Sequence, residues 1–324
     1  MRENLLGIDI GGTKCAVIYG IKENNTIAIV DKIIFETTNV HETINNICES
    51  TTKIMTKHQL NEKNTCAIGI SCGGPLNSKK GIIQSPPNLY GWDHIPIIDI
   101  ITKKFKIPTG IQNDANAGAL AEWEFGAGRN TDNMVFMTCG TGLGAGLILN
   151  GKLYSGANDN AGEIGHIRLS DYGPVGYGKM GSFEGFCSGG GIAQLAKSKV
   201  VEKIQIGESV TWCRKDHLEK ITAKMVADAA IAGDKLALDI LKTSATYLGK
   251  GLSIIIDILN PQLIVMGGIY SRNEKLFKSH VMQIIKKEAL ANSYKVCNIQ
   301  PSVLGEAIGD YAALSVAVNI IKRV

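Results

Sequence analysis

The segment from residue 111 to residue 151 carries residue types that suit the transfer of a phosphoryl group to an alcohol. It contains a carboxylate, Asp114, flanked by carboxamides, and further on an apolar run, 134–137, that leads into the turn 140–142 (GTG). A strand that opens into a glycine- and threonine-rich turn can direct backbone N–H groups toward a phosphate. A carboxylate from another segment can accept the proton of a hydroxyl group that faces this phosphate. The segment therefore indicates phosphoryl transfer from a nucleotide to a sugar-like alcohol.

A similar turn lies near the N-terminus. The runs 5–10 and 15–19 predict two strands that are joined by the tight turn 11–14 (GGTK). Two glycines let this backbone approach an anion closely, and the threonine and lysine add hydrogen-bond donors. Asp9, at the end of the first strand, is suited to hold Mg²⁺ directly or through water. An ordinary surface hairpin also accounts for this stretch taken alone.

The two turns share one layout, in which an apolar strand, a turn with glycine and threonine, and a second apolar strand follow each other. The pair predicts a duplicated domain with a phosphate held between the halves. A further strand, 262–266, ends at two glycines, which permit close contact with a flat base or a ribose. The candidate nucleotide-binding residues are Asp9, Gly11, Gly12, Thr13, Lys14, Gly140, Thr141, Gly142, Gly267 and Gly268.

A proline- and asparagine-containing loop, residues 85–92, carries side chains that suit a sugar. Asn88 offers an amide to hydroxyl groups, and Trp92 offers an aromatic face to the C–H groups of a ring. A structural turn with a packed tryptophan is the alternative interpretation. Asp114 also has an alternative role, as the N-cap of a helix predicted over residues 117–125.

The glycine-rich segment 152–191 contains few long apolar runs and is predicted to be irregular. Long ordered loops of this kind are usually functional. Its residues Glu163, His166 and Glu184 can form hydrogen bonds with the hydroxyl groups of a polyol. The alternative is that Glu163 and His166 only brace the loop.

The expected elements alternate between strands and helices, which is typical of an α/β protein with a mixed sheet. Strands are expected at 5–10, 15–19, 26–35, 65–71, 108–112, 134–137, 262–266 and 297–303. Helices are expected at 41–57, 98–105, 117–125, 192–201, 222–232, 235–259, 274–291 and 309–321. Several candidate residues come directly after a predicted strand, so the ends of the strands must position them.

Composition argues against several functional classes. The net charge of +4 arises from 34 basic and 30 acidic residues, which is too balanced to indicate binding to nucleic acid or to an anionic membrane. The chain contains no run of about 18 apolar residues, so no membrane span is predicted. Residues 1–4 lack the features of a signal peptide, and a cytoplasmic location is therefore expected.

Five motifs follow one another along nearly the whole chain. They are DIGGTK at 9–14, NDANAGALAE at 113–122, GTGLGAG at 140–146, GEIGH at 162–166 and IVMGG at 264–268. In this order they resemble the ROK family of sugar kinases and sugar-responsive repressors. Any one of the motifs alone is weakly specific, whereas five in sequence are specific.

The resemblance implies an α/β, actin-like (ribonuclease-H-like) two-domain ATPase fold, duplicated, with a cleft between the domains. The smaller N-terminal domain would comprise residues 1–113 and the larger C-terminal domain residues 114–308. The closing helix, 309–324, would pack back on the smaller domain. The resemblance also implies a homodimer.

The resemblance further implies roles for single residues. Asp114 would act as the general base. The sugar would contact Gly74, Asn88, Asn113, Asp114, Glu163, His166 and Glu184. The phosphates of ATP and Mg²⁺ would face Asp9, Gly12, Thr13, Thr141 and Gly142, and the adenosine would lie near Gly268.

The sequence departs from the family at one metal site. Many members carry a CxCGxxGCxE motif after the GxxGH segment, in which three cysteines and the histidine bind zinc. Aligned on Glu184, the three cysteine positions hold Val175, Tyr177 and Ser182, none of which offers a thiolate. Zinc requires about four ligands, so no zinc site is predicted. Packing of aromatic side chains is expected to hold this loop instead.

These expectations give an ATP- and Mg²⁺-dependent phosphorylation of the primary hydroxyl of a hexose, with glucose as the first candidate. N-acetylmannosamine, N-acetylglucosamine, fructose and allose are alternatives, as is inorganic polyphosphate as the donor, since loop geometry controls such choices. Sugar-responsive repressors are the rival class, but only eight residues precede Asp9, too few for a helix-turn-helix. A sugar-binding regulator without catalysis is also an alternative, although Asp9, Thr13 and Asp114 are all present.

Overall fold

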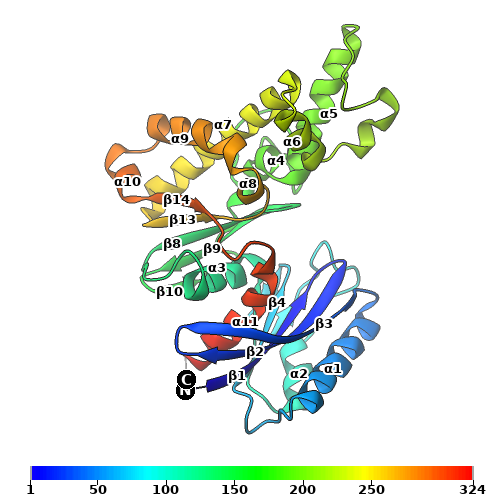
Figure 1. Ribbon diagram of the computed structural model, residues 1–324, viewed down its shortest axis with the longest axis vertical. Coiled ribbons are helices and arrows are strands. Elements are labelled where there is room, and N and C mark those ends of the chain that lie inside the picture. The colour runs from blue at the N-terminus through cyan, green and yellow to red at the C-terminus, as the bar shows by residue number, and fades with distance from the viewer. Residues whose placement is uncertain (1, 323–324) are drawn as a thin grey trace. The chain divides into compact units, whose positions relative to one another are not determined.

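The computed structural model describes residues 2–322, which form two compact units (Figure 1). Unit 1 consists of Met1–Phe136, Gly146–Ala161 and Val303–Val324, and unit 2 of Met137–Ala145 and Gly162–Ser302. The predicted domain division after residue 113 is not decided by this grouping and stays a prediction.

A five-stranded mixed sheet forms the centre of unit 1. Its strands are β1 (Arg2–Ile10), β2 (Lys14–Glu23), β3 (Thr26–Glu36), β4 (Ala67–Cys72) and β7 (Thr109–Asn113), in the order β3-β2-β1-β4-β7. Strand β2 pairs antiparallel with both β1 and β3, whereas β1 pairs parallel with β4, and β4 parallel with β7. The predicted N-terminal hairpin and the mixed sheet are both confirmed.

Helices cover both faces of this sheet because successive strand residues point to opposite sides. On one face, Leu6, Ile8 and Ile10 of β1 belong to an apolar cluster that includes buried residues of α1 (Val40–Lys57) and α2 (Ile97–Phe105). On the other face, Leu5 belongs to a second cluster, formed mainly by the closing helix α11 (Ile308–Ile321). Figure 1 shows α1 and α2 in blue and cyan beside the sheet and α11 in red.

The closing helix approaches the sheet backbone directly. A Cβ atom added at Gly69 of β4 would lie 2.1 Å from the carbonyl oxygen of Ala313 and 2.3 Å from the backbone nitrogen of Ala317. Real Cβ contacts are never this short, so α11 can pack here only because position 69 has no side chain. The small residues of α11 make the same close approach possible from the helix side.

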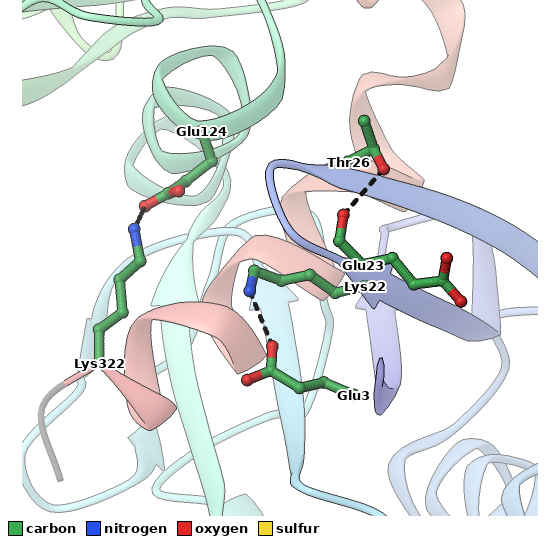
Figure 2. A network of polar contacts seen from close by, with 6 residues as sticks. All are labelled: Glu3, Lys22, Glu23, Thr26, Glu124 and Lys322. Atoms are coloured by element: carbon green, nitrogen blue, oxygen red, sulfur yellow. Dashed lines mark hydrogen bonds and ion pairs between the residues drawn. The ribbon is translucent and has the colours of Figure 1, made fainter. Parts of the chain in front are cut away.

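Helix α11 also packs along α3 (Asp114–Phe125), and the two helices are joined near their C-terminal ends. Figure 2 shows the Nζ atom of Lys322 beside the carboxylate of Glu124, at a distance of 2.6 Å from its Oε1 atom. The same view shows Lys22 paired with Glu3 across the β1–β2 hairpin at 2.8 Å. The first of these pairs fixes the ends of two helices whose other ends carry Asp114 and Asp310.

The remaining elements largely agree with the predictions. A second sheet has the order β10-β9-β8-β13-β14, with β8 (Met134–Cys139), β9 (Leu143–Leu149), β10 (Lys152–Tyr154), β13 (Leu263–Met266) and β14 (Asn298–Pro301). The helices of unit 2 are α4 (Phe183–Cys187), α5 (Gly189–Gln205), α6 (Ala223–Ile231), α7 (Lys235–Leu259), α8 (Gly268–Arg272), α9 (Glu274–Glu288) and α10 (Ala291–Val296).

Two expectations about the elements need correction. The helix predicted over residues 274–291 ends at Glu288, because Ala289 adopts an extended backbone, and a separate helix follows at Ala291. The segment 152–191, expected to be irregular, contains the short helix α4 and the small hairpin of β11 (Val175–Gly176) and β12 (Lys179–Met180). Short pairs and single turns of this kind lack the periodic pattern from which longer elements are recognised.

Within residues 2–322, none of the helices combines the length and the apolar character that crossing a membrane requires.

Replacing Gly69 by alanine is expected to lower the free energy of unfolding by about 2–3 kcal/mol, because backbone atoms of α11 must move to admit the methyl group. Urea denaturation measures the change. Gly73→Ala is the matched control, since an added Cβ there meets no atom within 4 Å. Equal stability of the two variants would contradict the close packing of α11.

Candidate active site

The carboxyl ends of three parallel strands meet at one edge of the unit 1 sheet. Asp9 of β1 is level with Ser71 of β4, and Cys72 of β4 is level with Asn113 at the end of β7. Asp114 follows Asn113 directly, as the first residue of α3. Ligands of open α/β sheets bind at such an edge, beyond the carboxyl ends of the strands. The topology therefore brings Asp9 and Asp114, which lie far apart in the sequence, to one place.

A cavity of about 190 Å³ opens at this edge. It is lined by Asp9, Ile10, Gly11, Gly12, Ser71, Cys72, Gly73, Gly74, Pro86, Pro87, Asn88, Leu89 and Asp114. Six of these residues are predicted site residues, from both the nucleotide-binding and the sugar-binding sets. Asn113, Thr13 and Lys14 are not among the lining residues, and the latter two are exposed.

The loop 85–92 lies against the N-terminal turn. A Cβ atom at Gly12 would be 2.7 Å from the carbonyl oxygen of Asn88 and 2.9 Å from its Cβ atom. The predicted phosphate turn and a predicted sugar residue are therefore in direct contact, and glycine at position 12 permits this. Trp92 is completely buried in the core of unit 1, so the structural interpretation of this residue is the correct one.

The carboxyl group of Asp9 sits in an unfavourable electrostatic environment. Its pKa is raised to about 7, first by burial and then by the negative charges of Asp310 and Asp114. Lys32 and a hydrogen bond from Ser71 oppose this effect. A positive charge placed in the cavity would relieve the repulsion among the three carboxylates.

Asp114 lines the cavity, and part of its surface is exposed to solvent. The protein atoms around its carboxyl group nevertheless reduce the hydration of this group. Burial of this kind raises the pKa of Asp114, against the lowering effect of the backbone N–H of Ala115. A raised pKa brings a carboxylate closer to the range in which a general base works best.

The N-cap of α3 is Asn113, not Asp114, so the alternative role of Asp114 is wrong. The Oδ1 atom of Asn113 accepts the backbone N–H of Asn116 at 2.7 Å, and α3 begins at Asp114. Asp114 Oδ1 accepts the N–H of its neighbour Ala115, at 2.8 Å, and Asp114 does not cap the helix. Because Asn113 satisfies the helix end, the carboxylate of Asp114 is left directed to the cavity.

Two residues near Asp9, Gly309 and Asp310, were not among the predicted site residues. Asp310, in the first turn of α11, lies beside Asp9 and forms an ion pair of 2.5 Å with Lys32 of β3. A Cβ atom at Gly309 would be 3.0 Å from Asp9 Oδ2, which shows how close the start of α11 lies. No motif signals these residues, because their proximity to Asp9 depends on the position of the last helix.

Unit 2 contains the other glycine- and threonine-rich turn. The backbone N–H of Gly140 donates to the carbonyl of Gly142 at 3.0 Å, and the N–H of Gly189, at the start of α5, donates to the carbonyl of Gly140 at 2.8 Å. Glu184 Oε2 accepts the backbone N–H of Leu143 at 2.9 Å. A predicted sugar-binding carboxylate is thus fixed next to the predicted phosphate turn, within the same unit.

The remaining candidates of unit 2 occupy separate positions. Glu163 immediately precedes the single helical turn η1 (Ile164–His166), His166 is its last residue, and both are exposed. Gly267 and Gly268 lie at the junction of β13 with α8, where the N–H of Gly267 donates to the carbonyl of Met137 at 2.8 Å. None of these contacts tests the proposed roles, which stay predictions.

The donors around the expected zinc position do not fit a zinc site. Ser182 is the N-cap of α4 and accepts the N–H of Gly185 at 3.1 Å. The buried thiol of Cys187 donates to the carbonyl of Ser244 at 3.6 Å. Within residues 2–322, no group of three or more His, Cys, Asp or Glu side chains is arranged to hold a metal ion. The absence of zinc stays a prediction, which metal analysis of the purified protein decides.

The sequence profile of the ROK family matches residues 5–320. A glucokinase of Halalkalibacterium halodurans is 32% identical over 309 residues, which cover 94% of this chain and 92% of that protein. A xylose repressor of Caldicellulosiruptor bescii is 29% identical over 243 residues, which cover 75% of this chain and 60% of the repressor. The chain is therefore similar to proteins of two functional classes.

The fold has clear counterparts among solved structures. A ROK family glucokinase from Streptomyces griseus, in complex with glucose and AMPPNP, superposes with a TM-score of 0.75 at 26% identity. The superposition covers 99% of this chain and all of that chain. The predicted actin-like α/β fold class is confirmed.

Replacing Asp9 by asparagine is expected to stabilise the protein at pH 8 in the absence of nucleotide. In the folded state the pKa of Asp9 is about 7, against 3.8 for the ordinary group, so the folded protein binds more protons between these values. Stability is therefore lost as the pH rises from about 4 to about 7. The variant avoids this loss, so its free energy of unfolding should exceed that of the wild type by on the order of 1–3 kcal/mol at pH 8 and by less at pH 5.

Urea denaturation of both proteins at the two pH values measures the difference, with the exposed Asp99→Asn as the control. A gain that is the same at both pH values would show that Asp9 ionises as an ordinary surface carboxylate.

Proposed function

Because the chain belongs to the ROK family, we propose that it is a sugar kinase that phosphorylates the primary hydroxyl of a hexose with ATP and Mg²⁺. The observation that carries this proposal is the cavity at the edge of the unit 1 sheet, where Asp9, Gly12, Gly74, Asn88 and Asp114 meet. Here the carboxylate of Asp9 can bind a cation, the backbone at Gly12 can bind an anion, and the carboxylate of Asp114 can accept a proton.

Asp114 is proposed as the general base. Its carboxylate is not occupied by a helix cap, it lines the cavity, and its pKa is raised. A carboxylate of this kind accepts the proton of a hydroxyl group as the oxygen attacks phosphorus. The capping hydrogen bond of Asn113 holds the first turn of α3 and thereby the backbone of Asp114.

The residues present also fit Mg²⁺ and a nucleotide. Magnesium takes oxygen ligands and commonly uses only one or two protein carboxylates beside water and phosphate oxygens. Asp9 provides a carboxylate at the cavity wall, among negative charges that a cation would stabilise. When bound, ATP supplies the phosphoryl group, and the ion offsets the charge of its phosphates. The turn at 11–14 is the proposed source of backbone N–H donors at this cavity.

Glucose is the proposed first substrate, supported by the glucokinases among the relatives. N-acetylmannosamine, N-acetylglucosamine, fructose and allose are the alternatives, because small differences in loop geometry distinguish these sugars. The homodimer and the cytoplasmic location inferred from the sequence are part of the same proposal.

A sugar-responsive regulator is the second candidate, favoured by the similarity to the xylose repressor. A coupled assay for ADP release over the panel of hexoses separates the two functions. A kinase releases ADP with at least one sugar, whereas a regulator binds a sugar without releasing ADP. Sugar binding with no ADP release from any member of the panel would overturn the proposed activity.

Asp114→Asn is expected to lower kcat by about 100-fold or more, because the amide cannot accept the proton of the attacking hydroxyl group. Sugar binding should persist, since the side chain keeps its size and its hydrogen-bonding capacity. Steady-state kinetics and calorimetric titration with the best sugar measure the two effects. The exposed Asp99→Asn is the control. Turnover of D114N near the wild-type rate would exclude Asp114 as the base.

A further inference from the structure

A small hairpin lies between two of the predicted sugar-binding residues of unit 2. Its strands β11 and β12 pair Val175 with Met180 and Gly176 with Lys179, and we refer to residues 175–180 as the 175–180 hairpin. In sequence it follows His166 and precedes Glu184. Two paired strands of two residues each are not stable alone, so other parts of unit 2 must hold them.

Gln194 of α5 holds one strand of the hairpin through two hydrogen bonds to the same residue. Its Nε2 atom donates to the carbonyl oxygen of Val175 at 2.8 Å, and the backbone N–H of Val175 donates to its Oε1 atom at 3.1 Å. A carboxamide can donate and accept in this way from one planar group. The other strand is held by Arg168, whose Nη1 atom donates to the carbonyl of Met180 at 2.9 Å.

The 175–180 hairpin in turn contacts the backbone of His166. The Nζ atom of Lys179 donates to the carbonyl oxygen of His166 at 2.8 Å. The ring of Tyr177 lies edge-on to the imidazole, with 6.4 Å between the ring centroids and 77° between the planes. The position of His166 therefore depends on where the hairpin lies.

The hairpin also contacts Glu184. A Cβ atom at Gly176 would lie 2.8 Å from the Cβ atom of Glu184 and 2.6 Å from the backbone nitrogen of Gly185, so β11 packs directly on the start of α4. Glu184 is the residue whose Oε2 atom accepts the N–H of Leu143. Displacement of β11 would release the start of α4 and with it this carboxylate.

We propose that Gln194 is a positioning residue for the sugar site, which holds the 175–180 hairpin against His166 and Glu184 without a metal ion. This inference rests on the proposed function, in that His166 and Glu184 are taken to contact the sugar. The 175–180 hairpin contains no cysteine that could bind a metal ion. Hydrogen bonds and packing must therefore hold it in place. The ring of Phe186 supports the same region by stacking on Tyr247, at 3.5 Å and 7°.

The test compares Gln194→Met, which keeps the length of the side chain and removes both hydrogen bonds, with Gln205→Met as the matched control. Gln205 lies at the exposed end of the same helix. Hydrogen exchange of the whole chain should become faster at Val175 and in residues 163–167 in Q194M only. The KM for the sugar should rise about five-fold or more, with kcat changed less than about two-fold and the KM for ATP unchanged.

Two further variants separate positioning from a general loss of structure. Gln194→Glu keeps the acceptor for the N–H of Val175 but sets a carboxylate oxygen against the carbonyl oxygen of Val175, so its KM for the sugar should rise at least as far as that of Q194M. Lys179→Met removes the contact with His166 and should accelerate exchange in residues 163–167 while the amide of Val175 stays protected.

The inference is overturned if exchange in residues 163–167 is the same in Q194M and wild type, or if kcat falls while the KM for the sugar is unchanged. It is also overturned if purified protein contains one zinc ion per chain and chelation reproduces the behaviour of Q194M. The exchange measurement needs no turnover. A chain that phosphorylates no sugar would therefore refute the proposed function, while exchange alone would still decide whether Gln194 positions His166.

Discussion

The contact of α11 with the bare backbone at Gly69 is the constraint on which the candidate site in unit 1 depends. It fixes the last helix on the sheet, so that the start of this helix brings Gly309 and Asp310 to Asp9 at the end of β1. The packing of α11 against α3 likewise fixes the position of Asp114, which is the first residue of α3. Three carboxylates from distant parts of the sequence are therefore held near one another by apolar packing and not by attraction among themselves.

This arrangement stores electrostatic free energy in the folded protein. Like charges in a poorly hydrated site raise the pKa of Asp9 and Asp114, and the ion pair of Lys32 with Asp310 offsets only part of the repulsion. A positive charge beside these carboxylates would lower both pKa values and would recover part of this free energy.

Local patterns in the sequence predicted most elements and six of the residues that line the cavity, because strand ends with glycine and aspartate have recognisable chemistry. The cap of α3 was harder to assign, since Asn113 and Asp114 are both good capping residues and only the geometry shows which one accepts the N–H of Asn116. The role of Asp310 was out of reach, because its neighbours are set by the packing of α11 on Gly69. The break before Ala291 was missed since the apolar spacing continues through it.

The hydrogen bonds between Gln194 and Val175 involve only main-chain atoms of the hairpin. The side chains of Val175, Tyr177 and Met180 are exposed, and none of them takes part in these bonds. Substitution of Val175 or Met180 would therefore leave both hydrogen bonds in place. A metal-held loop has no such freedom, because its ligands must be conserved. A hairpin held through its main chain in this way can change its exposed side chains without losing its hydrogen bonds to α5.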